Sequence, residues 1–159
     1  MMKAVYPGSF DPLTFGHLDI IGRCQKIFCN LTILIANNPK KKYFLNTNER
    51  LTIVKEEVKI YPRVEIDVFD GLLVDYCNEN NINLIIRGIR PLSDFDYEFE
   101  MAMMNKKMNS DVETLFIITD QEFFYIRSSI VKELFSLKAN IDKLVPKRVV
   151  DILKKKAER

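Results

Sequence analysis

Residues 6–17 contain the side chains best suited to bind phosphate groups. The stretch reads YPGSFDPLTFGH and includes the hydroxyl residues Ser9 and Thr14 and the single histidine of the chain, His17. A short strand pattern precedes it and apolar residues at helical spacing follow it, so it is a strand-to-helix turn. His17 would lie on the first turn of that helix, where unpaired N–H groups and the helix dipole favour an anion. The pattern therefore predicts an anion site.

The same stretch has two simpler interpretations. A lone histidine is more often a capping or packing residue than a catalyst, and glycine and proline after a strand usually mark only a turn. The hydroxyl residues and Gly16 favour the anion site, because a helix start beside hydroxyl groups and a residue without a Cβ suits phosphate. We expect backbone or ligand to approach Gly16 where a Cβ would collide.

The length and composition exclude several classes of protein. A chain of 159 residues with 47% apolar and 29% charged residues is typical of one globular domain, so we expect a single domain over 1–159 with C-terminal helices from about 128. No apolar run has the length of a membrane helix, and no signal-peptide core is visible, so we expect a cytoplasmic protein without a membrane partner. The odd cysteine count agrees with this location, and no metal-ligand spacing appears. A net charge of +2 is too weak to indicate nucleic acid.

Five apolar or alternating runs predict strands, and a helical pattern follows each of them. The strands are expected over residues 3–6, 31–36, 64–69, 83–87 and 113–119. The first helix is expected to have His17 on its first turn. The others are expected from a capping box of Asn46 and Glu49 to Pro62, after Gly71, from Ser93 or Asp94, from Ser128 or Ser129, and from Pro146. This alternation predicts an α/β fold, a doubly wound, Rossmann-like five-stranded parallel sheet with helices on both faces.

Ligands of such sheets bind beyond the carboxyl ends of the strands. The polar candidates all fall at that edge: Ser9 and His17 after the first strand, Lys40, Lys41 and Lys42 after the second, Arg87 and Arg90 at the fourth, and Ser128 and Ser129 after the fifth, with Leu72 and Leu73 after the third. The lysine run is by itself typical of a solvated loop. Together with a protonatable His17, these groups could hold a triphosphate and stabilise charge on a transferring group.

No nucleophilic triad is visible, because Asp11, Asp94 and Glu98 are not paired with a histidine. An attacking phosphate would need no general base, since its second pKa is about 6 and it is ionised near neutral pH. The inventory therefore predicts chemistry on phosphates that works by positioning and electrostatics. Arg87 lies within an otherwise apolar run, and a buried arginine needs an anion.

The segment Thr14-Phe-Gly-His17 is similar to the T-x-G-H form of the H-x-G-H signature of the nucleotidylyltransferase superfamily. Longer matches resemble the phosphopantetheine adenylyltransferase family: residues 6–12, 16–21, 86–90, 93–98 and 104–105. They run in order from about residue 3 to the final helix. The resemblance implies a nucleotidylyltransferase fold, transfer of AMP from ATP to 4′-phosphopantetheine to give dephospho-coenzyme A and pyrophosphate in coenzyme A biosynthesis, Mg²⁺ as cofactor, and a homohexamer.

The resemblance also implies roles for individual residues. The catalytic set would be His17, Ser9, Lys41 and Arg90. The ATP site would comprise Ser9, Phe10, His17, Gly88, Ile89, Arg90, Glu98, Phe123, Phe124, Tyr125, Ile126, Arg127, Ser128 and Ser129. The acceptor site would comprise Ser9, Lys41, Leu73, Arg87 and Asn105. The Mg²⁺ ion would be held mostly by phosphates and water, with no protein ligands.

Some features leave alternatives open. Arg127 stands where the family usually has serine, so one hydroxyl is lost and a charge is gained there, whereas Ser9 keeps the hydroxyl of the usual threonine. Four methionines of one helix, Met101, Met103, Met104 and Met108, are expected as core or interface filler. Rival functions are a sister transferase that uses CTP or nicotinamide mononucleotide, a class I tRNA synthetase fragment, and a non-catalytic nucleotide-binding module. This chain has no KMSKS-like loop, which argues against a tRNA synthetase fragment. Arg87 and Lys41 argue against a non-catalytic module, because such a module needs no site for a phosphate acceptor.

Overall fold

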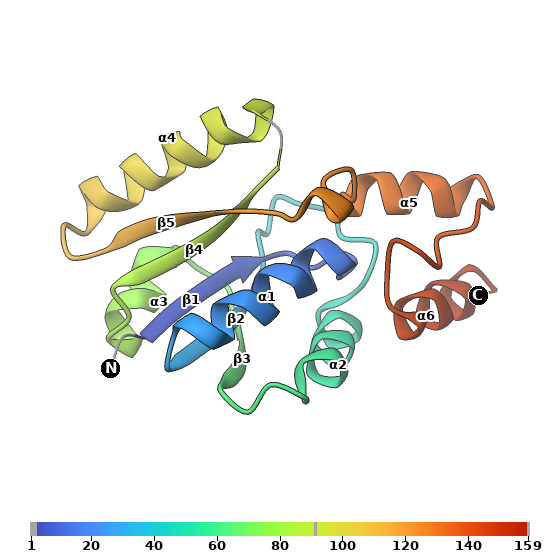
Figure 1. The fold of residues 1–159 in the computed structure, drawn as a ribbon, viewed down its shortest axis with the longest axis horizontal. Helices are drawn as coiled ribbons and strands as arrows, with labels where there is room; N and C mark the ends of the chain where they lie inside the picture. The colour runs from blue at the N-terminus through green and yellow to red at the C-terminus, as the bar shows by residue number, and fades with distance from the viewer. Residues whose placement is uncertain (1–2, 91, 159) are drawn as a thin grey trace.

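The computed structural model describes residues 3–90 and 92–158, and the side chains of residues 92–94 lie outside that description. Its centre is a five-stranded sheet with helices on both faces (Figure 1). The strands are β1 (Lys3–Gly8), β2 (Asn30–Ala36), β3 (Val64–Phe69), β4 (Leu84–Ile89) and β5 (Glu113–Ile118). All pairs are parallel, in the order β3-β2-β1-β4-β5. The predicted doubly wound parallel sheet is confirmed.

The helices follow the strands as the sequence predicts. They are α1 (Phe15–Ile27), α2 (Thr47–Val58), α3 (Leu73–Asn80), α4 (Leu92–Met108), α5 (Ser128–Ser136) and α6 (Lys147–Ala157), with a short 3₁₀ turn, η1 (Gln121–Phe123), that the pattern does not predict. The capping box of α2 is confirmed, because Asn46 and Glu49 each accept a backbone N–H of the other at 2.8 Å. The expected caps of α4, Ser93 and Asp94, lie outside the described side chains.

Strand β1 is longer than the sequence predicts, since it continues through Pro7 and Gly8 instead of ending at Tyr6. Both residues stay in register with β2. The carbonyl of Pro7 faces the other neighbour, β4, and accepts a hydrogen bond from Arg87 there. Because β4 forms no ladder with β1 at that level in the described residues, the N–H that proline lacks breaks no strand pairing.

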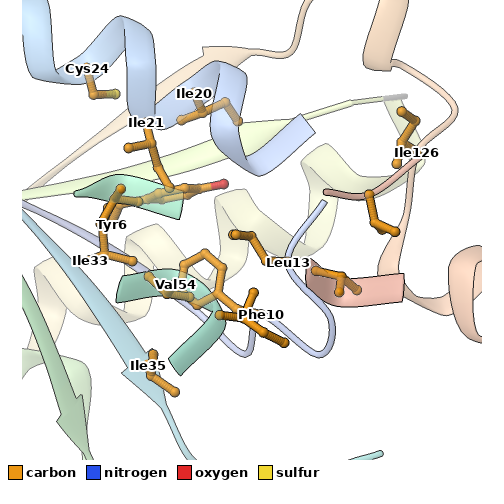
Figure 2. Close-up of a cluster of buried hydrophobic side chains, with 14 of the residues drawn as sticks. Tyr6, Phe10, Leu13, Ile20, Ile21, Cys24, Ile33, Ile35, Val54 and Ile126 are labelled. Atoms are coloured by element: carbon orange, nitrogen blue, oxygen red, sulfur yellow. The ribbon is translucent and has the colours of Figure 1, made fainter. Parts of the chain in front are cut away.

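Two cores cover the two faces of the sheet. On one face, α1 and α2 pack together with the C-terminal segment, and Figure 2 shows Ile20, Ile33, Val54 and Ile126 of this cluster. On the other face, Tyr76 and Cys77 of α3 pack on β1, β2 and β4. In Figure 1, α5 and α6 lie beyond the carboxyl ends of the strands. They extend the first core past the edge where the candidate residues gather.

Helix α4 differs from the expectation for its methionines. Met101, Met103, Met104 and Met108 are 39% to 55% exposed, so the part of the expectation that places them in the core is wrong. Among the described residues no helix is long and apolar enough to span a bilayer. Cys24 and Cys77 are buried, Cys29 is exposed, and all three are free thiols.

Candidate active site

The sheet opens between β1 and β4, which is where the strand order reverses. In the described residues these strands pair only at Val5 and Ile85. Further along, the Arg87 side chain bridges the gap and its Nη1 donates to the Pro7 carbonyl at 3.1 Å. A crevice at the carboxyl side of such a reversal is the usual ligand site of an open α/β sheet.

The turn after β1 is anchored by the Phe10 side chain. Its ring is 1% exposed and makes edge contacts with the rings of Tyr6 at 5.8 Å and His17 at 5.2 Å. Figure 2 shows the Phe10 ring inside the core beside Leu13. The backbone of Phe10 is left-handed, with φ of 47°. Gly8 is needed beneath this ring, because a Cβ there would lie 2.9 Å from it.

His17 caps its own helix with one side of the ring. The Thr14 N–H donates to His17 Nδ1 at 3.1 Å, and the His17 N–H donates to Thr14 Oγ1 at 3.4 Å. Because a backbone N–H only donates, Nδ1 is the unprotonated nitrogen and the ring proton lies on Nε2. The capping interpretation is therefore right, and it leaves Nε2–H as a donor for a ligand.

The surroundings of His17 decide its charge. Burial of the ring, aided by the nearby Arg90 charge, lowers the pKa of His17 to about 3. The ring is therefore neutral near pH 7 in the protein without ligand, so the protonatable His17 adds no positive charge to the site in this state. A neutral imidazole still offers a directed N–H to a phosphate oxygen.

One cavity gathers most of the acceptor residues implied by the resemblance. It has a volume of about 1220 Å³ and is lined by Ser9, Lys41, Leu73, Arg87 and Glu98, among others. Lys40 and Lys42 are absent from its lining. A smaller adjoining pocket of about 230 Å³ shares the last three of these residues and adds Asn105. The structure thus brings these side chains together from the turn after β1, from β4, α3 and α4, and from the loop after β2.

Arg87 and Glu98 form a two-pronged ion pair in this cavity. Arg87 Nε and Nη2 donate to the two Glu98 carboxylate oxygens at 2.5 and 2.6 Å. Burial opposes the charge of Arg87, but the hydrogen bonds to Glu98 raise its pKa above the usual value. The anion paired with the half-buried Arg87 is therefore Glu98, a residue that the resemblance assigns to ATP.

The residues implied for ATP lie mostly outside this cavity. Gly88 faces α1, and a Cβ there would lie 2.2 Å from Ile20, so this glycine lets the helix pack on β4. Arg127 is the N-cap of α5 without a side-chain cap hydrogen bond, and Ser128 Oγ donates to the Pro12 carbonyl at 2.8 Å. Residues 123–129 contribute nothing to the described lining of the cavity.

No atom of the described residues lies close enough to Gly16 to collide with a Cβ there. A Cβ at this position would meet Phe123 at 3.6 Å, which is an ordinary contact. The part of the expectation in which protein backbone would collide with a Cβ there is wrong, and the approach of a ligand stays a prediction. The glycine that the turn requires sterically is Gly8. The reason is that Phe10 folds back over Gly8, a tertiary contact that the local pattern does not reveal.

Asp11 is a structural residue of the site that the sequence reasoning did not identify. Its buried carboxylate accepts the N–H groups of Phe44 at 2.9 Å and Leu45 at 2.7 Å, and it pairs with Lys132 at 3.1 Å. It thereby fastens the loop that carries Lys41 to the turn after β1.

Arg50 is the second residue that was missed. It is buried in α2, and its Nη1 donates to the Ser9 carbonyl at 2.9 Å. A signal was present in the sequence, because Arg50 precedes Val54 and Val58 by four and eight residues. An arginine in the apolar stripe of a helix points to a buried charge.

No group of three or more histidine, cysteine, aspartate or glutamate side chains in the described part of the chain is placed to hold a metal ion. The carboxylates of Asp11 and Glu98 already accept hydrogen bonds from protein donors.

Comparisons with known proteins agree with this geometry. Residues 5–134 match the family model described as Cytidylyltransferase-like. The phosphopantetheine adenylyltransferase of Geotalea daltonii is 47% identical over 156 residues, which cover 98% of this chain and 97% of that protein. The enzyme of the same name from Geobacter metallireducens is 49% identical over 153 residues, with 96% and 94% covered.

A solved structure shows the same fold at low identity. It is a Vibrio parahaemolyticus protein assigned as a nicotinate-nucleotide adenylyltransferase, with a TM-score of 0.68, 15% identity, and 96% and 99% of the two chains covered. The likeness confirms the nucleotidylyltransferase fold and carries no argument about the substrate. From the near full-length identity to the relatives, this chain belongs to the phosphopantetheine adenylyltransferase family.

Proposed function

We propose that this chain transfers AMP from ATP to 4′-phosphopantetheine at the crevice between β1 and β4, giving dephospho-coenzyme A and pyrophosphate in coenzyme A biosynthesis. The observation that carries the assignment to this site is the meeting of two features. A turn with a directed His17 Nε2–H lies at the same sheet edge as a cavity lined by Lys41 and Arg87. Each is suited to one of two phosphate-bearing substrates.

The acceptor fits the cavity and its small neighbour. Lys41 and Arg87 would hold the phosphate of 4′-phosphopantetheine. The adjoining pocket is mainly apolar, with Leu73, Met101 and Ala102 in its wall, and it contains the amide of the buried Asn105. Apolar walls with one fixed polar group suit the pantetheine arm, which has a carbon chain and two amides.

ATP would bind on the other side of the turn. The residues proposed for it are Gly88, Ile89 and Arg90 at the end of β4, the segment from Phe123 to Ser129 at the start of α5, and the Ser9 hydroxyl and Phe10 backbone of the turn. The N-terminus of α5 offers backbone N–H groups to phosphate oxygens. In this arrangement the α-phosphate lies between the two subsites.

The chemistry requires no protein base. The acceptor phosphate attacks the α-phosphorus as an ionised oxygen, and pyrophosphate leaves. His17 Nε2–H, Ser9 and the Arg90 charge would stabilise the negative charge that develops on the transferring group. Lys41 and Arg87 hold the attacking oxygen in place, which is the positioning part of the rate enhancement.

Mg²⁺ would enter as the complex with ATP. The residues fit an ion held by phosphate oxygens and water, because Asp11 and Glu98 are occupied by protein donors. The ion supplies charge neutralisation on the triphosphate when bound.

A direct assay tests the function. The protein is mixed with Mg²⁺, ATP and 4′-phosphopantetheine, and pyrophosphate and dephospho-coenzyme A are measured. Matched reactions replace the acceptor by pantetheine, which lacks the phosphate, or by nicotinamide mononucleotide, and replace ATP by CTP. Product is expected only from the first mixture. Turnover with CTP or the mononucleotide would support a sister transferase, and ATP binding without turnover would support a non-catalytic module.

We also infer that the chain works as a single domain and assembles into the homohexamer implied by the family resemblance. Ile126, Val131 and Leu153 of the C-terminal segment share one core with α1 and α2, which supports one domain. Exposed apolar side chains cover α4 and the edge strand β5, and such a patch supports association. The free thiols support a reducing compartment such as the cytoplasm.

A further inference from the structure

Arg50 lies at the wall of the large cavity and is 1% exposed. Its Nη1 donates to the Ser9 carbonyl at 2.9 Å, and its Nη2 donates to Asn37 Oδ1 at 2.5 Å and Thr47 Oγ1 at 3.2 Å. The guanidinium carbon lies 4.2 Å from the centre of the Tyr43 ring. The buried Nε has no hydrogen-bond partner among the described atoms.

The surroundings of Arg50 do not explain its charge as part of an ion pair. Its described hydrogen-bond partners are all neutral oxygens, and Asp11 and Asp70 act on it only through the field of their charges. Burial lowers the pKa of Arg50. Burying a cation without a carboxylate in contact costs free energy of folding. A side chain that only packed at this place would therefore be apolar.

The Ser9 carbonyl that Arg50 holds belongs to the peptide of Phe10. This peptide is trans, so its C=O and N–H point in opposite directions. The Phe10 N–H donates no hydrogen bond to any described residue. Fixing the oxygen on the α2 side therefore fixes a free donor on the opposite side.

From this geometry we propose that Arg50 is a positioning residue. It holds the Ser9–Phe10 peptide so that the Phe10 N–H donates a hydrogen bond to a phosphate oxygen of the reacting substrates. The proposal rests on the function proposed above. The positive charge of Arg50, in contact with the Ser9 carbonyl, also polarises the peptide and strengthens its N–H as a donor.

A second contact makes the arrangement rigid. Asn37, which accepts from Arg50, follows β2, and its own amide donates to Asp70 after β3 at 2.6 Å. One guanidinium therefore links the loops after β1, β2 and β3. Groups held by such supporting hydrogen bonds keep the geometry that catalysis needs.

The kinetic test compares Arg50→Met and Arg50→Lys with Arg23→Met. Arg23 is the matched control, because it also donates to a backbone carbonyl, that of Ile118 at 2.7 Å, and is outside the proposed machinery. A fall of kcat by about 30-fold or more is expected for Arg50→Met, on the scale of one lost oriented donor. Its KM values should change by less than about threefold, the lysine variant should recover part of kcat, and the control should stay within about twofold of the wild type. A raised KM for 4′-phosphopantetheine at unchanged kcat would overturn the proposal and make Arg50 an acceptor ligand.

A spectroscopic test does not depend on turnover. Ser9–Phe10 is the only Ser-Phe pair in the chain, so ¹³C-carbonyl serine with ¹⁵N-phenylalanine labels that single peptide. Addition of inorganic pyrophosphate should shift the Phe10 amide signal in the wild type, and the shift should shrink in folded Arg50→Lys. An unresponsive wild-type signal, or an equal shift in the variant, would refute the positioning role. Since this readout needs no acceptor, it is separate from a failure of the adenylyl-transfer assay.

Discussion

At the scale of single residues, the two ring nitrogens of His17 have different roles. Nδ1 accepts the Thr14 N–H and caps α1, which fixes both the tautomer and the direction of Nε2–H. The capping and catalytic interpretations of a lone histidine are therefore compatible. A donor whose orientation is set before the ligand arrives needs no reorganisation during the reaction.

Replacing His17 by two different residues separates these two roles. His17→Asn keeps an oxygen near the Nδ1 position for the cap but has no atom at Nε2, whereas His17→Ala loses both. We expect kcat to fall by about 10²-fold or more in both variants, the usual cost of one preorganised donor. Thermal melting should show the alanine variant to be the less stable, by about 1 kcal/mol for the lost cap. Near-normal turnover of the asparagine variant would remove His17 from the mechanism.

The lowered pKa of His17 predicts how stability depends on pH. The pKa falls from 6.5 to about 3 on folding, so between these values the unfolded chain binds a proton that the folded chain does not. Stability contributed by neutral His17 is therefore present above pH 6.5 and is lost as pH falls toward 3, by at most about 1.4 kcal/mol per pH unit. Urea unfolding of the wild type between pH 4 and 7 should be steeper in pH than that of His17→Asn. Parallel curves would contradict the neutral, buried ring.

The Arg87–Glu98 pair leads to a prediction about the two substrates. Arg87→Ala should weaken the binding of 4′-phosphopantetheine by about tenfold or more, because a charge-assisted hydrogen bond contributes about 1.5 to 3 kcal/mol. ATP affinity should change less. Isothermal titration calorimetry measures both, and Glu98→Gln is the control that removes the partner charge while keeping Arg87. Loss of ATP affinity alone would reverse the assignment of the subsites.

At the scale of the elements, the strand and helix order could be predicted because apolar periodicity and the capping box of Asn46 and Glu49 are local signals. The edge of the sheet where the candidates gather followed from parallel topology. The contacts of Asp11 with Phe44, Leu45 and Lys132 could not be predicted, because these partners lie 33, 34 and 121 residues away in the sequence. The contact of Arg50 with the Ser9 carbonyl spans 41 residues and could not be predicted for the same reason. The steric need for Gly8, and not Gly16, could not be predicted for the same reason, since only the folded turn shows which glycine lies under Phe10.

The start of α5 carries the prediction for Arg127. This residue is the N-cap, where its backbone is extended and its side chain forms no cap hydrogen bond. Backbone N–H groups of the first turn serve phosphate whatever the side chain, so Arg127→Ser should change the KM for ATP by less than about threefold. A serine at the N-cap should also make this variant more stable than Arg127→Ala by about 1 kcal/mol in thermal unfolding. A tenfold rise in KM would instead identify Arg127 as a nucleotide ligand.

At the scale of the whole molecule, apolar side chains are covered in one region of the protein and exposed in another. The α1 and α2 side continues into α5 and α6 and buries its apolar groups in one core. The edge strand β5 and helix α4 instead leave apolar side chains exposed. Ile118 of β5 is 70% exposed, and Phe99 and Met103 of α4 are also exposed. An edge strand with an apolar face is a site that proteins usually cover. This asymmetry supports an interface on the α4 and β5 side.

The assembly prediction follows from that asymmetry. Light scattering after size exclusion should give the wild type a mass of about six times 18.6 kDa, if the interface builds the hexamer implied by the resemblance. Met103→Glu combined with Ile118→Glu places two charges on the proposed interface, and burying unpaired charges there should shift the protein to smaller species. Leu137→Glu is the matched control, because Leu137 is 71% exposed after α5 and lies outside the α4 and β5 side. A monomeric wild type, or equal dissociation of the control, would exclude this surface as the interface, since charge would then act on the fold or on solubility and not on a contact between copies.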